Sequence, residues 1–362
     1  MQFGTFHLPL SPSPDEDYRV INQQFECIEL AEKLGFECAW LTEHNFTGED
    51  AYGDPIPLAA ALAQRTKKIR IGFAILQMAI HHPTRILLQT SLLDNLLNGR
   101  LTVGIGRGSK FNEFEYVAFG VEGDDTEHRE RMFEGIDYMK KAWQANGEPL
   151  DYNGNYFNLS IPGVRPKPVQ TPHPLIQMSG SSNDTLAWAA INNCPIMLPR
   201  MGIEIAVERF NFYKEQMENA GHSEQIIQNN LNVSTLQRSI HVAETDEEAY
   251  ENVQEPTHRL RKHLLTTRAK FNPEESNQEE KAKGHDSQKW SSPVFTPDEG
   301  VADYLQRGVI YGSVKTVKEK IDELDKKDIR SLMACFDWGD MDQEKVQASM
   351  KKFGKEIIPA FQ

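Results

Sequence analysis

Four short stretches of this sequence carry side chains that could do chemistry or bind a ligand. The first, "WLTEHNFTGED" at 40–50, places Glu43 beside His44 at the end of an apolar run. A buried carboxylate next to an imidazole raises the pKa of the histidine and fixes its tautomer, which suits a general base or a hydrogen-bond donor near neutral pH. The alternative is a solvated pair in a loop, because neighbouring strand residues point to opposite faces.

The second stretch, "GIGRG" at 104–108, flanks Arg107 with glycines. Glycine lets the backbone approach a ligand closely, and a guanidinium can bind a phosphate through two hydrogen bonds. The spacing is not that of a dinucleotide-binding GxGxxG motif. The alternative is a tight turn with an exposed arginine.

The third stretch, "SGSSNDT" at 179–185, lies between an expected strand and a helix that starts near Asp184. The backbone N–H groups at a helix start, together with the hydroxyls of Ser181, Ser182 and Thr185, can hold an anion. A helix cap without a ligand is the alternative. The position late in the chain favours a phosphate site if the fold is a barrel.

The fourth stretch, "AIHHPTR", places His81 and His82 before a helix opened by Pro83. Two histidines invite a metal reading, but adjacent side chains diverge and no accompanying carboxylate cluster follows them. We therefore expect His82 to line a pocket or to cap the helix, and we expect no metal site.

Composition narrows the class of protein. The 362 residues are 39% hydrophobic and carry a formal charge of -14, with a pI near 5.3. Nucleic-acid binding needs concentrated Lys and Arg, so this balance argues against it and favours a protein acting on a small molecule. The four cysteines are scattered without a CxxC pair, which predicts reduced thiols and no structural zinc; they are Cys27, Cys38, Cys194 and Cys335.

Nothing in the sequence predicts a membrane protein. No window approaches 18 uncharged apolar residues, so we expect no membrane span. The first residues lack a basic leader and read as a strand that starts at once. The expected location is the cytoplasm.

The four stretches can form one site only if secondary structure brings them together. The pattern of apolar residues along the chain predicts strands that end at these stretches. Apolar runs alternate with amphipathic segments; strands are expected at 1–8, 37–43, 68–78, 101–108, 174–180, 195–199, 231–243 and 331–337, and helices at 15–34, 56–66, 83–97, 126–145 and from about 183. Alternation repeated about eight times predicts a parallel sheet. We expect one domain over 1–362, closed as a (β/α)8 TIM barrel, because the reactive residues follow several different strands. An open doubly wound sheet is the alternative.

Two regions break this rhythm. The segment "IPGVRPKPVQTPHP" at 161–174 is rich in proline and predicts an extended connection. Residues 255–300 are polar and charged, which predicts an insertion at the C-terminal face of the barrel that is either a mobile lid or disordered.

The order and spacing of several motifs together resemble the bacterial luciferase-like flavin-dependent monooxygenases, nearly from end to end. The motifs are "FGTF", "AEKLGFECAWLTEHNF", "HHPTRILLQTSLLDNLLNGRLTVGIGRG", "HRERMFEGIDYMKKAW", "PLIQMSGSSNDTLAWAA" and "YGSVKTVKEKI". The resemblance implies a TIM barrel that binds FMN in its mouth. It also implies that an NAD(P)H-dependent flavin reductase supplies the FMN in reduced form, that O2 is the oxidant, and that the chain forms a homodimer.

The resemblance assigns roles to individual residues. Glu43 and His44 match the catalytic pair, with His44 as base or hydrogen-bond donor. The segment 73–75 matches the support of the flavin ring, often through a cis peptide bond that does not precede proline. The implied cofactor residues are Ala74, Ile75, Arg107, Arg129, Met178, Gly180, Ser181, Ser182 and Thr185, and the implied substrate-pocket residues are Asn45, His82 and Trp290.

Departures from the family pattern limit the implied reaction. Asn45 stands where luciferases proper carry a second histidine, and Gly106 stands where they carry a cysteine, so light emission is not expected. The expected reaction is oxygenation of a small organic substrate: ring opening of an N-heteroaromatic such as trigonelline, otherwise attack on an aldehyde or ketone. The alternatives are a deazaflavin- or flavin-dependent dehydrogenase and a flavin-binding protein without catalysis.

Overall fold

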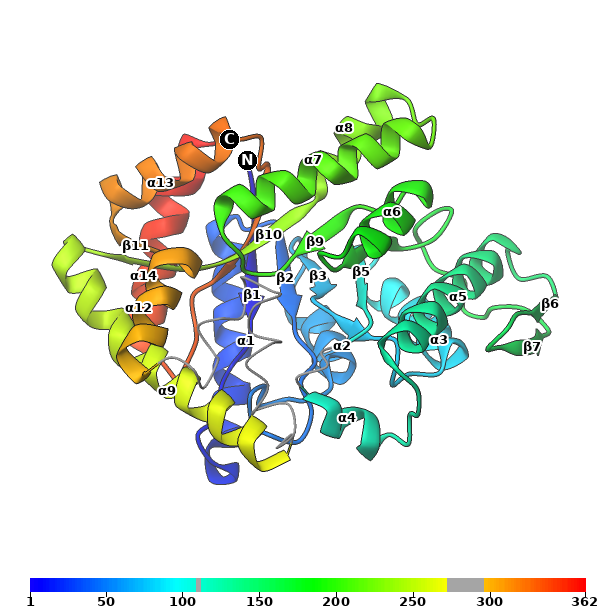
Figure 1. Cartoon of the computed structure of the whole chain (residues 1–362), viewed down its shortest axis with the longest axis horizontal. Helices are drawn as coiled ribbons and strands as arrows, with labels where there is room; N and C mark the ends of the chain where they lie inside the picture. Colours follow the sequence, from blue (N-terminus) through cyan, green and yellow to red (C-terminus); the bar gives the residue numbers. More distant parts are fainter. Residues whose placement is uncertain (109–111, 272–295) are drawn as a thin grey trace.

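A ring of eight parallel strands forms the centre of the protein in the computed structural model, which describes residues 1–108, 112–271 and 296–362 (Figure 1). In hydrogen-bonded order the strands are β1 (Gln2–His7), β2 (Cys38–Leu41), β3 (Arg70–Phe73), β5 (Leu101–Gly106), β8 (Leu175–Ser179), β9 (Ile196–Leu198), β10 (Thr235–Ala243) and β12 (Ser331–Cys335). The pairing of β12 with β1 closes the ring. The expected (β/α)8 barrel is confirmed.

Helices surround this ring (Figure 1). They include α1 (Asp17–Leu34), α2 (Pro55–Arg65), α3 (Pro83–Leu96), α4 (Glu113–Ala118), α5 (Asp125–Gln144), α6 (Asn183–Ile191), α7 (Ile203–Asn219), α8 (Glu224–Val233), α9 (Asp246–Phe271), α12 (Pro297–Gly308), α13 (Val314–Lys326) and α14 (Gln343–Lys352). Helix α1 ends at Gly35, which adopts the left-handed conformation with φ 85°, as glycine commonly does at the end of a helix. Among the described helices, none combines the length and the apolar character needed to cross a bilayer.

The interior of the barrel is closed by a tryptophan. Trp40 is buried in a small cluster with Cys38, Met197 and Met333, separate from the larger core between strands and helices. Gly4 and Gly72 make room for its indole: a Cβ on Gly4 would lie 2.7 Å from Trp40 Nε1, and a Cβ on Gly72 would overlap the ring. The glycines therefore let one large side chain fill the interior of the barrel.

Four short additional strands are present among the described residues, and two of them pair with strands of the ring. β4 (Leu76–Gln77) pairs with β5, and β11 (Val309–Ser313) pairs with the second half of β10. β6 (Leu150–Asn153) and β7 (Asn158–Ile161) form an antiparallel hairpin that the sequence analysis did not predict. Beyond β7, residues 162–174 carry neither helix nor strand, as expected of this proline-rich connection.

The expectation of an irregular segment at 255–300 is wrong at both ends of this range. Helix α9 continues to Phe271, and α12 begins at Pro297. The apolar residues Val253, Leu260 and Leu264 recur at helical spacing and are buried. Residues 272–295, which include Trp290, lie outside the described part of the chain, and so does most of the expected lid.

Candidate functional site

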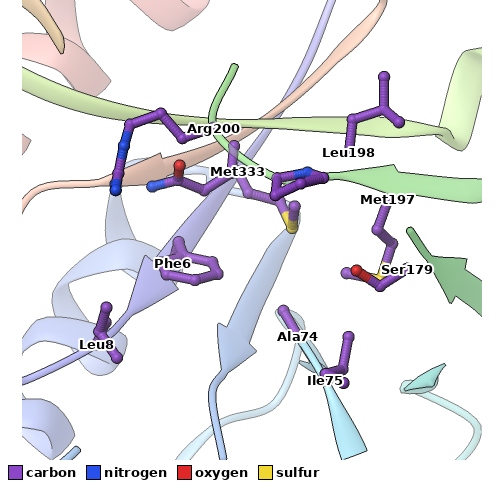
Figure 2. A pocket seen from close by; sticks show the side chains of 11 residues that line it. Phe6, Leu8, Ala74, Ile75, Ser179, Met197, Leu198, Arg200 and Met333 are labelled. Carbon is purple, nitrogen blue, oxygen red and sulfur yellow. The ribbon is translucent and has the colours of Figure 1, made fainter. Parts of the chain in front are cut away.

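A pocket opens at the carboxyl ends of the barrel strands and contains about 650 Å³ of empty space, part of it open to solvent. Its walls come from both halves of the chain (Figure 2). The lining residues are Phe6, Leu8, Ala74, Ile75, Ser179, Met197, Leu198, Pro199, Arg200, Gln237 and Met333. Apolar walls with a few polar groups are the usual composition of sites for small molecules and cofactors.

One wall of the pocket is formed by Ala74 and Ile75, which are joined by a cis peptide bond as expected. The Ala74 backbone N–H donates to the Leu41 carbonyl at 2.7 Å, so this wall is fixed to the end of β2. Gly106 lies against the Ile75 side chain, and a Cβ there would overlap it. Glycine at 106 therefore allows Ile75 to reach its place.

The serine loop links the pocket to the start of α6. Ser179, the last residue of β8, lines the pocket. The Ser182 hydroxyl accepts from the Thr185 backbone N–H at 3.3 Å and donates to Thr185 Oγ1 at 3.0 Å. Ser182 is thus the N-cap of α6, and Gly180 packs on Thr185, where a Cβ would lie 2.8 Å from Thr185 Cγ2. The free backbone N–H groups of this helix start are suited to an anion.

The two arginines assigned to a phosphate each pair with an aspartate at the start of a helix. Arg107, after β5, pairs with Asp125 at 3.2 Å. Arg129, on α5, pairs with Asp184 in the first turn of α6 at 3.1 Å. The side chains of the two aspartates are 49% and 67% exposed. Exposed pairs of this kind contribute little free energy, so an incoming phosphate could replace the aspartates.

Glu43 is buried and holds the segment that follows Ile75. Its Oε2 accepts from the Gln77 backbone N–H at 2.7 Å, and its Oε1 lies 2.7 Å from His81 Nε2. Burial, the largest effect on His81, lowers its pKa, but the hydrogen bond and charge of Glu43, with the charge of Asp54, outweigh it and raise the pKa. His81 was not selected by the sequence analysis, which favoured its neighbour.

His44, the residue after Glu43, contacts a different set of polar side chains. Its Nδ1 is 3.1 Å from Asn112 Nδ2 and 4.0 Å from Glu49 Oε1. The following residue, Asn45, donates its backbone N–H to Glu115 at 2.6 Å. Asn112 therefore orients the imidazole through Nδ1 and turns Nε2 away from itself. Neither Glu43 nor His44 is among the residues that line the described pocket.

Two further assigned residues, His82 and Met178, do not line this pocket. His82 is exposed and caps α3, accepting from the Thr84 N–H at 3.3 Å, beside a separate surface hollow between α3 and β7. The Met178 side chain is 0% exposed and packs in the outer core, so it faces away from the pocket. The methionine that lines the pocket from this side is Met197. Trp290 is outside the described residues.

Several pocket residues had no signal in the sequence. Met333 looks like an ordinary strand residue, and Arg200 and Gln237 belong to no recognisable motif. The signal that could have found Arg200 is its position directly after β9, since residues at the carboxyl ends of barrel strands form the site in this fold. Among the described residues, no group of three or more His, Cys, Asp or Glu side chains could hold a metal ion.

Residues 1–330 match the family model of the luciferase-like monooxygenases. The chain belongs to this family. The resemblance seen in the sequence is thereby confirmed, and so is the expected class of enzyme, a flavin-dependent monooxygenase.

Relatives cover the chain to different extents. The flavin-dependent trigonelline monooxygenase oxygenase component of Acinetobacter baylyi is 24% identical over 100% of this chain and 96% of that protein. The alkanal monooxygenase alpha chain of the Kryptophanaron alfredi symbiont is 32% identical, and protein y4wF of Sinorhizobium fredii is 31% identical. These two alignments span only about half of each chain, 55% and 54% of this one and 54% and 55% of the relatives.

Solved structures share the fold along the whole chain. The oxygenating constituent of 3,6-diketocamphane monooxygenase from Pseudomonas putida, solved with FMN, superposes with a TM-score of 0.80 at 20% identity and covers 100% of this chain and 99% of that one. The monooxygenase RslO1 from Streptomyces bottropensis gives 0.78 at 22% identity, with 100% of both chains covered. At these identities the likeness establishes the barrel and no more.

Proposed function

We propose that this protein is the oxygenase component of a two-component monooxygenase. An NAD(P)H-dependent flavin reductase supplies reduced FMN, and the enzyme uses it with O2 to oxygenate a small organic molecule. The observation that carries the proposal is the continuity of the pocket with the α6 start: an apolar wall at Ala74 and Ile75 continues through Ser179 to the loop before α6, whose first turn pairs with Arg129.

The pocket wall and the start of α6 fit the shape and charge of FMN. The Ala74–Ile75 wall and Met197 offer apolar surface to a flat ring. The start of α6, with Ser181, Ser182 and Thr185, offers N–H and O–H donors, and Arg107 and Arg129 offer positive charge for the phosphate. When bound, reduced FMN supplies two electrons and the position at which O2 reacts.

The protein side of the chemistry belongs to the Glu43–His44 loop. His44 would hold or deliver a proton at Nε2, because Asn112 occupies Nδ1. Glu43, through the backbone of Gln77 and the imidazole of His81, would position that loop against the wall formed by Ile75. The apolar lining would keep water from the reacting atoms.

Replacement of His44 by alanine tests this role. His44→Ala should leave FMN affinity within about twofold of wild type and lower product formation by at least about 10²-fold, the usual effect of a lost acid–base group. The measurements are flavin titration and single-turnover product analysis with reduced FMN. His258→Ala, at a histidine on α9, is the matched control. Full activity of His44→Ala would remove this residue from the mechanism.

Oxygen uptake with reduced FMN and a substrate panel separates the classes of function. Uptake coupled to an oxygenated product supports a monooxygenase. Hydride transfer without uptake supports a dehydrogenase, and tight FMN binding without turnover supports a flavin-binding protein. The panel begins with N-heteroaromatics, since the trigonelline enzyme aligns with the whole chain, and continues with aldehydes and ketones.

The quaternary state belongs to the same proposal. Helix α3 presents Leu88, Leu92 and Leu96 to solvent, with exposures of 38%, 49% and 40%. These residues are four apart and therefore share one helix face. We propose that this leucine face joins two copies of the chain in a homodimer.

A further inference from the structure

We propose that the side-chain amide of Gln237 binds the substrate, and that the substrate is a neutral, mainly apolar molecule with an N–H group next to a carbonyl, as in a lactam or a carboxamide. The inference rests on the proposed function for one point, that the flavin takes the side of the pocket next to Ile75 and Ser179. It extends that function by naming the chemical class of the substrate.

The first observation is that the sheet directs the Gln237 side chain into the pocket. Gln237 lies on β10 and lines the pocket, and its Cα is paired in the ladder with Met333 of β12, which lines the same pocket. Side chains alternate between the two faces of a strand, and the preceding residue, Leu236, packs in the core between strands and helices. The backbone of β10 therefore fixes the place from which the amide reaches the pocket.

The second observation is that this amide is buried without a partner. Gln237 is 5% exposed, and its side chain makes no hydrogen bond to the protein in the part of the chain that the structure describes. Buried polar groups are paired as a rule, because an unpaired one has lost its hydrogen bonds to water. Other buried glutamines follow this rule and donate from Nε2 to a carboxylate or a carbonyl; they are Gln24, Gln77 and Gln177. Gln237 therefore offers one donor group and one acceptor to a molecule in the pocket.

The third observation is that Gln237 lies across the barrel from the wall proposed for the flavin. In the ring of strands, β10 is four strands away from β3 in either direction, and β3 is the strand that leads to Ala74 and Ile75. Figure 2 shows Phe6, from β1, on the opposite side of the pocket from Ser179. A flavin at the Ile75 wall with its phosphate toward α6 therefore leaves the Gln237 side for the second ligand.

The chemistry of the amide and of the lining sets the class of ligand. A glutamine amide donates from Nε2 and accepts at Oε1. A lactam or carboxamide satisfies both atoms at once, because its carbonyl accepts from Nε2 while its N–H donates to Oε1. A ketone or a carboxylate lacks the N–H and would leave Oε1 without a donor. The rest of the ligand should be apolar, since Phe6, Leu8, Leu198 and Met333 line the same pocket.

The lactam δ-valerolactam and the ketone cyclohexanone test this assignment by calorimetric titration of the protein loaded with oxidised FMN. The two rings have the same size, and the lactam alone has an N–H beside its carbonyl. Wild type should bind the lactam at least about tenfold more tightly, because the lactam pairs with both atoms of the amide. Gln237→Met keeps the length of the side chain without its polar atoms and should abolish this preference. Gln225→Met, at an exposed glutamine on α8, is the matched control and should keep it.

Thermal unfolding of the FMN-loaded protein without either probe gives an independent readout. Replacement of an unpaired buried amide by an apolar side chain of similar shape should leave the melting temperature of Gln237→Met equal to or above that of wild type. A lower melting temperature would show that the protein already pairs the amide and would overturn the inference. Equal binding of the two probes by wild type would also overturn it, and so would a lactam preference that survives Gln237→Met.

Titration with FMN keeps the two proposals apart. Failure of wild type to bind FMN would contradict the proposed function and with it the substrate assignment. Normal FMN binding without a lactam preference would contradict only the role of Gln237. A loss of FMN affinity of about tenfold or more in Gln237→Met would show that the amide holds the flavin, since that is the effect of one lost hydrogen bond, and would overturn its assignment to the substrate.

Discussion

At the scale of single residues, Gln77 connects the two buried acids of the site. Its backbone N–H and side-chain amide donate to the Glu43 carboxylate and backbone carbonyl, and the same amide donates to Glu115 at 2.8 Å. Burial raises the pKa of Glu115, while His44, Asn45 and Gln77 oppose this shift. Two carboxylates in a dry site need such donors, because an unsatisfied buried charge is costly.

The Glu43–His81 pair should make stability depend on pH. The folded-state pKa of His81 is above its ordinary value of 6.5, so the protonated ring stabilises the fold fully below that pH. The contribution is lost as the pH rises through the folded-state pKa. His81→Gln should therefore reduce the decline of unfolding free energy above about pH 6.5. Urea denaturation at a series of pH values from about 5.5 to about 8.5 measures this decline.

His222→Gln serves as the control for this measurement, because His222 lies between α7 and α8 and bonds the Ala190 carbonyl. A change of slope in this variant as large as that in His81→Gln would show that the effect is not specific to the Glu43–His81 pair. A His81→Gln profile parallel to wild type would show that the pair does not couple protonation to folding.

The sequence allowed part of this site to be predicted. Glu43 and His44 stand out because a charged pair follows an apolar run, yet the choice between His81 and His82 depends on how the chain turns after β4. That turn directs His81 toward Glu43 and leaves His82 to cap α3. Spacing shows that adjacent side chains diverge but not which of them faces inward.

At the scale of elements, α5 and the start of α6 together should bind the phosphate of the cofactor. Arg129→Gln removes one charge next to the α6 start and should weaken FMN about tenfold, in line with a charge-assisted hydrogen bond. Riboflavin, which lacks the phosphate, should bind the variant and wild type equally. Flavin fluorescence titration with both compounds gives the comparison, and an equal loss for both would place Arg129 outside the phosphate site.

Element boundaries were predictable where local chemistry dominates. The end of α1 at Gly35 and the start of α3 at Pro83 follow from glycine and proline preferences. The C-terminal part of α9 and the start of α12 fall in the range 255–300, which was expected to be irregular because its composition is polar and charged. Thr296 and Glu299 form a capping box that marks the start of α12.

At the scale of the whole molecule, the leucine face on α3 should control assembly. Leu92→Glu places a charge in its middle, and burial of an unpaired charge at an interface is unfavourable. The variant should be monomeric where wild type is dimeric, as measured by light scattering coupled to size-exclusion chromatography. Ile191→Glu, at an exposed position that ends α6, is the matched control. Dimers of Leu92→Glu would locate the interface elsewhere.

The barrel itself followed from the alternation of strands and helices, but its interior did not. Phe6 from β1, Arg200 after β9 and Met333 from β12 meet in one pocket only because the ring closes between β12 and β1. Contacts of this kind depend on three-dimensional closure, which no local pattern in a single sequence encodes. This part of the pocket lining was therefore the part least accessible to sequence reasoning.

The indole of Trp40, which fills the interior of the barrel next to the pocket, should act as an internal optical reporter. Trp40 is 4% exposed and shares its cluster with Phe6, Ala74 and Ile75, which are themselves pocket residues. In the proposed binding mode, a flavin at the Ile75 wall would lie close to the indole and should lower its emission by energy transfer. The same side chain that completes the core thus makes occupancy of the pocket visible without a label.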